Sequence, residues 1–258
     1  MKDRQAIRAS WDRQSDDHYQ RQYGDAGAIE RLKKDPWLGF PSRVGRAIRE
    51  HFPVLRGMRV CVPSSGDNVA AFAFHLLGAS VTSCDLSGEQ IKNARKIAAA
   101  QEWELAFSIA DSMALEGIEN GAYDLVYTSN GVHVWISDLC AMYGSFRRVL
   151  KAGGRYIFFE THPFIRPFDD SSNALRVIKP YEKTGPFGDP PNYLWRICDF
   201  ANGLISSGFR IVNMDEFHAE KAIIGARWWD LDGWDAKADW HVNPYAALPQ
   251  WVSFCAVK

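Results

Sequence analysis

The segment from Arg59 to Asp85 constrains the fold of this chain more than any other. A short apolar run, Val60–Val62, leads into a turn of small residues, Ser64–Gly66, and an apolar helical segment follows. A second apolar run, Val81–Cys84, ends on the carboxylate of Asp85. In an open parallel sheet, this order places the turn and the carboxylate side by side at the carboxyl ends of neighbouring strands. The pattern predicts a site for an adenosine-containing cofactor, with both ribose hydroxyls donating to the carboxylate.

Predicted strands and helices alternate along the chain up to about residue 161. Apolar runs predict strands at 58–62, 81–84, 105–109, 123–128 and 155–160. Helix-favouring segments with cap signals predict helices at 68–77, at 88–101 and from 137 or 138 to 150. Farther on, we expect a helix at 193–207 and strands at 209–214 and 251–257. Such alternation is typical of βαβ units that build a parallel sheet.

The chain divides into four regions by composition and pattern. Residues 1–57 read as an N-terminal helical lid, and residues 58–161 as the cofactor-binding core. Residues 162–192 contain six prolines and are interpreted as an irregular insertion. Residues 193–258 would complete the sheet, and they include tryptophans at 228, 229, 234 and 240. These tryptophans could line an aromatic pocket or cover the sheet, because aromatic side chains bury much area in either role.

Composition excludes several classes of protein. The 258 residues are 47% hydrophobic, enough for one large α/β domain, and the formal net charge of −1 disfavours a general nucleic-acid binder. The N-terminus has no apolar signal segment, and the longest apolar stretch, Val69–Leu77, is too short to span a bilayer. The five cysteines form no Cys-x-x-Cys pair, and the histidines show no metal-ligand spacing. We expect a soluble cytoplasmic protein with no metal site.

The ordered set of motifs resembles the class I S-adenosylmethionine-dependent methyltransferases over about residues 58–217 and the last eight. Val60–Asn68 is similar to that family's first motif, and Asp85 to the acid that binds the ribose. Asp111 resembles the residue that meets the adenine amino group, and Phe146–Gly154 resembles the family's helix before the fifth strand. The resemblance implies a Rossmann-like, doubly wound, mostly parallel seven-stranded sheet with an antiparallel last strand. It also implies S-adenosylmethionine as cofactor.

The first motif departs from the family pattern of Gly-x-Gly-x-Gly. Ser64 stands where the first glycine is expected, Gly66 matches the second, and Asn68 replaces the third. Val62 takes the place of the usual acid, which puts one indirect contact to the cofactor's amino group in doubt, and Pro63 stiffens the turn. Serine and asparagine are small, and asparagine tolerates positive φ better than most residues. We therefore expect the turn still to approach the cofactor closely.

The resemblance implies cofactor contacts from the N-terminal lid, the first turn, the ends of the second and third strands, and the loop after the fourth. These residues are Tyr19, Tyr23, Pro63, Ser64, Ser65, Gly66, Asn68, Asp85, Leu86, Gln90, Asp111, Ser112, Met113, Ser129, Asn130 and Gly131. Each has an ordinary structural alternative. Gly66 could be a turn glycine, Asp85 a helix N-terminal carboxylate, and Leu86 or Met113 a core residue.

The implied chemistry is in-line displacement at the sulfonium methyl by an N, O, S or carbon nucleophile of a small-molecule acceptor. His133, in the loop after the fourth strand, is the first candidate for a general base, and His162, after the fifth, is its rival. A loop histidine bonded to backbone is the alternative for His133. The insertion, the tryptophan-rich segment and the N-terminal helix would form the acceptor pocket.

Three other functions remain open at this point. An oxidoreductase that uses NAD or NADP would need Gly-x-Gly-x-x-Gly, but the matching positions hold Ser64, Gly66 and Val69. An RNA or protein methyltransferase would need a basic face, which the net charge does not suggest. A scaffold protein could keep the fold without catalysis, as the altered first motif would allow. The acceptor, the methylated atom and the oligomeric state are not predicted.

Overall fold

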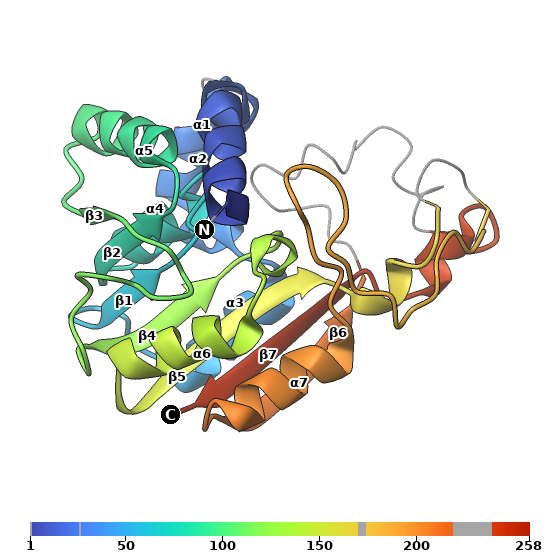
Figure 1. The fold of residues 1–258 in the computed structure, drawn as a ribbon. Coiled ribbons are helices and arrows are strands. Elements are labelled where there is room, and N and C mark those ends of the chain that lie inside the picture. Colours follow the sequence, from blue (N-terminus) through green and yellow to red (C-terminus); the bar gives the residue numbers. More distant parts are fainter. Residues whose placement is uncertain (1, 26, 170–173, 219–238) are drawn as a thin grey trace.

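A seven-stranded sheet forms the centre of the molecule (Figure 1). The computed structural model describes residues 2–25, 27–169, 174–218 and 239–258. The strands are β1 (Arg59–Val62), β2 (Ser80–Asp85), β3 (Ala106–Ile109), β4 (Tyr123–Thr128), β5 (Leu150–Thr161), β6 (Arg210–Phe217) and β7 (Trp251–Val257). They lie in the order β3-β2-β1-β4-β5-β7-β6. Strands β1 to β5 pair in parallel, whereas β7 runs antiparallel to both neighbours. The predicted fold class is therefore confirmed.

Helices cover both faces of this sheet. They are α1 (Lys2–Tyr23), α2 (Ala28–Lys34), α3 (Ser42–His51), α4 (Val69–Leu76), α5 (Gly88–Ala100), α6 (Leu139–Val149) and α7 (Ile197–Ser206). Alternate residues of a strand point to opposite faces. Leu125 and Tyr127 thus pack in one hydrophobic cluster with α2, α3 and α4, whereas Val126 packs in the other with α6 and α7. None of the described helices has the length and apolar character to cross a membrane.

Local capping signals explain the starts of two central helices. The Ser87 side chain accepts from the N–H of Gln90 at the start of α5, and Asp138 accepts from the N–H of Ala141 at the start of α6. The sequence predicts the cap at Ser87, and it allows either Ser137 or Asp138 as the start of the second helix. Each cap satisfies one of the backbone donors that a helix N-terminus leaves without an intrahelical partner.

Three predicted boundaries were wrong. The last helix, α7, begins at Ile197 rather than at 193, and the Asp199 carboxylate accepts from the N–H of the preceding residue, Arg196, at 2.9 Å. Helix α6 ends at Val149, and β5 follows at once because Leu150 already pairs with β4. Strand β6 continues to Phe217, along the whole length of its partner β7.

The region 162–192 is irregular, as expected. Its described part contains a 3-10 turn, Pro163–Ile165, and two isolated bridges, Phe168 to Val177 and Phe187 to Asn192. Trp240 is 57% exposed. The other three tryptophans of the predicted segment, at 228, 229 and 234, lie outside the described residues.

Candidate functional site

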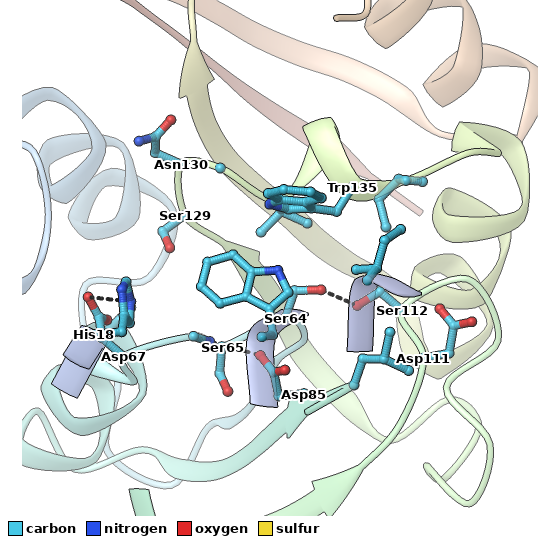
Figure 2. A pocket seen from close by; sticks show the side chains of 18 of the residues that line it. His18, Ser64, Ser65, Asp67, Asp85, Asp111, Ser112, Ser129, Asn130 and Trp135 are labelled. Carbon is cyan, nitrogen blue, oxygen red and sulfur yellow. Dashed lines mark hydrogen bonds and ion pairs between the residues drawn. The ribbon is translucent and has the colours of Figure 1, made fainter. Parts of the chain in front are cut away.

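A cavity of about 550 Å³ lies at the carboxyl ends of the central strands (Figure 2). Its walls include residues 64–67 after β1, 85–86 after β2, 111–113 after β3 and 129–132 after β4. The strand order reverses between β1 and β4, and open α/β sheets bind ligands at such switch points. Helix α1 closes one side with Ile7, Trp11 and His18. The volume lies within the range of roughly 300–1,000 Å³ that small-molecule sites occupy.

The turn after β1 forms the floor of the cavity. Ser64, Gly66 and Asn68 adopt φ values of 47°, 52° and 64°, all in the left-handed region. These are the three positions at which the family has glycine. A Cβ at Gly66 would make only an ordinary contact, 4.0 Å from Nε2 of His18, so the positive φ rather than crowding favours glycine there. The Ser64 hydroxyl bonds to that of Ser112 at 2.7 Å, joining the turns after β1 and β3.

Asn68 supports this turn from beneath and does not line the cavity. Its amide N–H donates to the Tyr19 hydroxyl at 2.9 Å and to the Gly66 carbonyl at 3.0 Å, and its oxygen accepts from Ser83 at 2.5 Å. Pro63 is likewise absent from the cavity wall. Both residues shape the turn, while Ser64, Ser65 and Gly66 face the cavity.

The two tyrosines of α1 also hold the turn instead of facing the cavity, which corrects their predicted placement. The Tyr19 hydroxyl lies 3.0 Å from the Gly66 carbonyl and 3.1 Å from that of Gln90, and the Tyr23 hydroxyl donates to the Asp67 carbonyl at 2.7 Å. Gln90 is fully buried and lines no part of the cavity. No local pattern predicts that the tyrosines of α1 bind the turn from the side away from the cavity.

Asp85 ends β2 at the cavity, and its carboxylate is held by two backbone donors. Gly66 N–H donates to Oδ2 at 3.0 Å, and Ser87 N–H donates to Oδ1 at 2.8 Å. The residue is 8% exposed. Burial raises the pKa of Asp85 to about 6, although these N–H groups offset part of the effect. Leu86 follows it along the cavity wall.

Asp111, Ser112 and Met113 form the wall after β3. Asp111 accepts from the Met113 N–H at 2.9 Å, and its other oxygen lies 3.1 Å from Nε of Arg4. This ion pair ties the start of α1 to the cavity, on the side away from the tyrosines.

The loop after β4 brings Ser129, Asn130 and Gly131 to the cavity. Glu160, at the end of β5, holds this loop by accepting from the N–H groups of Gly131 at 2.8 Å and His133 at 3.0 Å. Burial by itself raises the pKa of Glu160, but the His133 imidazole and the Gly131 N–H hold it below its usual value. The ionised carboxylate of Glu160 thus holds the loop after β4 from the side away from the cavity.

His133 does not reach the cavity, so its predicted position beside an acceptor is wrong. The residue is 1% exposed and packs against Phe158 and Phe200, each with ring centroids 4.6 Å away. Nδ1 lies 3.2 Å from Glu160, and Nε2 lies 3.0 Å from the Tyr143 hydroxyl. Since an ionised carboxylate only accepts, Nδ1 carries the hydrogen in the contact with Glu160.

The rival histidine, His162, is also turned away from the cavity. It is 4% exposed, its Nε2 lies 2.7 Å from Glu216, and its Nδ1 accepts from the Phe164 N–H at 3.1 Å. The histidine that does line the cavity is His18 of α1, which lies 3.9 Å from the carboxylate of Asp67. No local pattern predicts the position of His18, since only the packing of α1 brings it to the cavity.

Aromatic side chains cover the cavity. Trp135 stands above the turn in Figure 2, and Trp11 packs edge to face against it at 5.8 Å. Phe159 and Trp251 line the part formed by β5 and β7. No described residue of 162–192 belongs to the wall. The acceptor pocket predicted from that region therefore has no counterpart among the cavity-lining residues.

Residues 63–154 match a family described as a methyltransferase domain. An uncharacterized protein of Mycobacterium tuberculosis is 30% identical over 156 residues, which cover 58% of this chain and 53% of that protein. The chain therefore spans about half the length of the curated relatives it matches.

Solved structures share the fold at low sequence identity. A S-adenosylmethionine-dependent methyltransferase from Mesorhizobium loti superposes with a TM-score of 0.64 at 21% identity, covering 83% of this chain and 97% of that one. The magnesium protoporphyrin IX methyltransferase from Synechocystis, solved with bound SAH, gives 0.61 at 16% identity and covers 99% of both chains. Residues 63–154 thus match a methyltransferase domain, and the chain shares the Rossmann-like fold of solved S-adenosylmethionine-dependent methyltransferases.

Proposed function

We propose that this protein transfers a methyl group from S-adenosylmethionine to a small-molecule acceptor. The observation that carries the proposal is the convergence of the Gly66 turn, Asp85 and Asp111 on one cavity at the switch point of the sheet. In the class I methyltransferases that the chain resembles, these positions serve the cofactor.

The donor set of the cavity fits this cofactor. Asp85 uses one acceptor site on each oxygen for a backbone N–H, and a carboxylate has about four such sites, so it retains capacity for two ribose hydroxyls. Asp111 and the backbone after β3 would receive the adenine between Leu86 and Met113. The Gly66 turn and residues 129–131 would hold the methionine part of the cofactor.

S-adenosylmethionine would supply an activated methyl group on a sulfonium, which a nucleophile displaces in line. The protein's own contribution is to orient the two reactants and to exclude water. Trp11 and Trp135 cover the cavity, and the Arg4–Asp111 ion pair anchors α1 across it. A site covered by a helix suits a small acceptor better than a macromolecule, which supports that part of the proposal.

Calorimetric titration with S-adenosylhomocysteine, with NAD and NADP as controls, tests the cofactor. Micromolar binding of S-adenosylhomocysteine alone supports the proposal, and binding of a dinucleotide instead overturns it. Asp85→Ala should weaken binding by roughly 2–4 kcal/mol, because two charge-assisted hydrogen bonds are lost. Unchanged affinity in a folded variant would remove Asp85 from the ribose site. Binding with no transfer to any small acceptor would favour the scaffold alternative.

A further inference from the structure

One carboxylate in the cavity has an oxygen that the protein does not use. Oδ1 of Asp67 accepts from the Val69 N–H at 3.1 Å. Oδ2 lies 3.9 Å from Nε2 of His18, beyond hydrogen-bond distance, and no other described donor is bonded to it. The Tyr23 hydroxyl fixes the Asp67 carbonyl at 2.7 Å, so the residue is held from behind while its side chain faces the cavity.

In each of the other cavity carboxylates of the turns, both oxygens already contact a donor of the protein. Asp111 is paired with Arg4, and both oxygens of Asp85 accept backbone N–H groups. Figure 2 shows His18 and Asp67 together at the end of the cavity opposite Asp111, with Ser129 and Asn130 above them. The cavity thus has one end suited to adenosine and another that presents a carboxylate beside an imidazole.

Burial affects the protonation of Asp67 at the end of the cavity that contains His18. It raises the pKa of Asp67, and the nearby His18 and the Val69 N–H offset part of that rise. The side chains of both residues are 29% exposed, and Trp11 packs edge to face on the imidazole at 5.6 Å. A partly desolvated carboxylate with a free acceptor site favours a cationic donor over water. Val62 leaves the end of β1 without an acid, so the neighbouring turn supplies one instead.

We propose that Asp67 binds the ammonium group, and His18 the carboxylate, of the amino-acid end of the cofactor. The inference rests on the proposed function, because it assigns one end of the same site. In the family that the chain resembles, an acid at the end of the first strand serves the charged end of the cofactor. Here Val62 occupies that position, and Asp67 of the turn together with His18 of α1 would take over this role. In this arrangement α1 contributes directly to cofactor selectivity.

Two ligands separate this inference from the proposed function. S-adenosylhomocysteine carries the ammonium and the carboxylate, whereas 5′-methylthioadenosine shares the adenosine and the thioether but lacks both charged groups. We expect Asp67→Asn to weaken S-adenosylhomocysteine about 10- to 100-fold, as loss of one charge-assisted hydrogen bond predicts. Affinity for 5′-methylthioadenosine should stay within about twofold. Asparagine retains an oxygen for the Val69 N–H, so the turn should keep its shape.

His18→Gln should likewise lower the affinity for S-adenosylhomocysteine more than that for 5′-methylthioadenosine. The matched control is Asp85→Asn, which should weaken both ligands equally because the ribose is common to them. Equal losses for both ligands in Asp67→Asn, or no loss for either, would overturn the inference while leaving the proposed function intact. If the unmodified protein binds neither ligand, the proposed function fails and the inference falls with it.

Discussion

Asp85 places a titratable switch inside the cavity. Its carboxyl has a pKa raised to about 6, chiefly by burial. Only the ionised form accepts from both ribose hydroxyls, so ligand affinity should fall as the pH drops below about 6, approaching tenfold per pH unit. Titration with 5′-methylthioadenosine between pH 4.5 and 8 measures this, since that ligand lacks the groups that would face Asp67. Asp85→Asn should flatten the profile, and an unchanged slope in this variant would assign the effect elsewhere.

The carboxyl of Asp85 also makes the free energy of unfolding depend on pH, and this dependence runs opposite to that of ligand affinity. Its pKa in the folded protein lies above the ordinary value of 3.8. The folded state therefore binds more protons than the unfolded state between these values, and the contribution of Asp85 to stability falls as the pH rises through that window. The residue that favours binding at neutral pH thus costs stability there, as is common for groups in ligand sites.

Asn68 provides a test of the turn at the residue scale. Its φ of 64° favours glycine, which the family has at this position. Yet its amide bonds to Tyr19, Gly66 and Ser83, and the three bonds contribute about 1 kcal/mol each, against about 1–2 kcal/mol of backbone strain. We expect Asn68→Gly to lower the free energy of unfolding by about 1–2 kcal/mol in denaturant titration. A stabilised variant would show that backbone strain dominates; Asn213→Gly, on the edge strand β6, controls for general effects of glycine.

At the scale of elements, the end of β5 controls the loop after β4. Glu160 receives two backbone N–H groups of that loop and the imidazole of His133. Glu160→Gln keeps the shape but presents an amide N–H₂ where an acceptor is needed. One buried donor is then left unsatisfied, which should cost about 1–3 kcal/mol of stability and weaken ligand binding through Gly131. Denaturant titration and calorimetry measure the two effects.

Two comparisons sharpen the Glu160 experiment. Because the pKa of Glu160 is held below its usual value, its stabilising effect is full above the unfolded-state pKa and is lost as the pH falls through the folded-state pKa. Glu216→Gln is the matched control, since that side chain pairs with His162 but is 47% exposed. If both variants lose equal stability, the buried network around the loop has no special role.

Elements were predictable from sequence wherever a local signal decides them. The caps at Ser87 and Asp138 mark the starts of α5 and α6, and an apolar run marks β4. The start of β5 at Leu150 depends on pairing with Tyr123, 27 positions away in the chain, and no local pattern reports it. The wrongly predicted boundaries of β5 and β6 depend on such distant partners, whereas the start of α7 involves Arg196 and Asp199, which are close in sequence.

The same distinction applies to the site. Gly66, Asp85 and Asp111 were expected together because parallel strand ends meet at one edge, and all three line the cavity. His133 follows β4 in the chain as expected, but Phe200 and Tyr143 enclose it from helices that sequence alone does not orient. His18 reaches the cavity only through the docking of α1, so its position follows from tertiary packing.

At the scale of the whole molecule, the walls of the cavity come from two parts of the chain that are far apart in sequence, helix α1 and the strand ends of the central sheet. Beyond the ion pair of Arg4, α1 is docked by Asp12, which accepts from the Ser87 hydroxyl at 2.5 Å, and by Asn93 of α5, which donates to Ser15 at 2.9 Å. A ligand in the cavity would contact both parts at once. Its binding energy should therefore stabilise the closure of α1 as well as the strand ends.

This coupling predicts how S-adenosylhomocysteine changes the stability of the full chain. At a ligand concentration 100 times Kd, the free energy of unfolding should rise by about 2.7 kcal/mol, with a higher melting temperature, and NAD should have no effect. Hydrogen exchange should slow in two places, residues 7–18 of α1 and the turn 64–68. Since α1 forms a wall of the cavity, protection of the turn without protection of α1 would contradict its role. Protection of both segments, lost in Asp85→Ala, would establish that one ligand joins them.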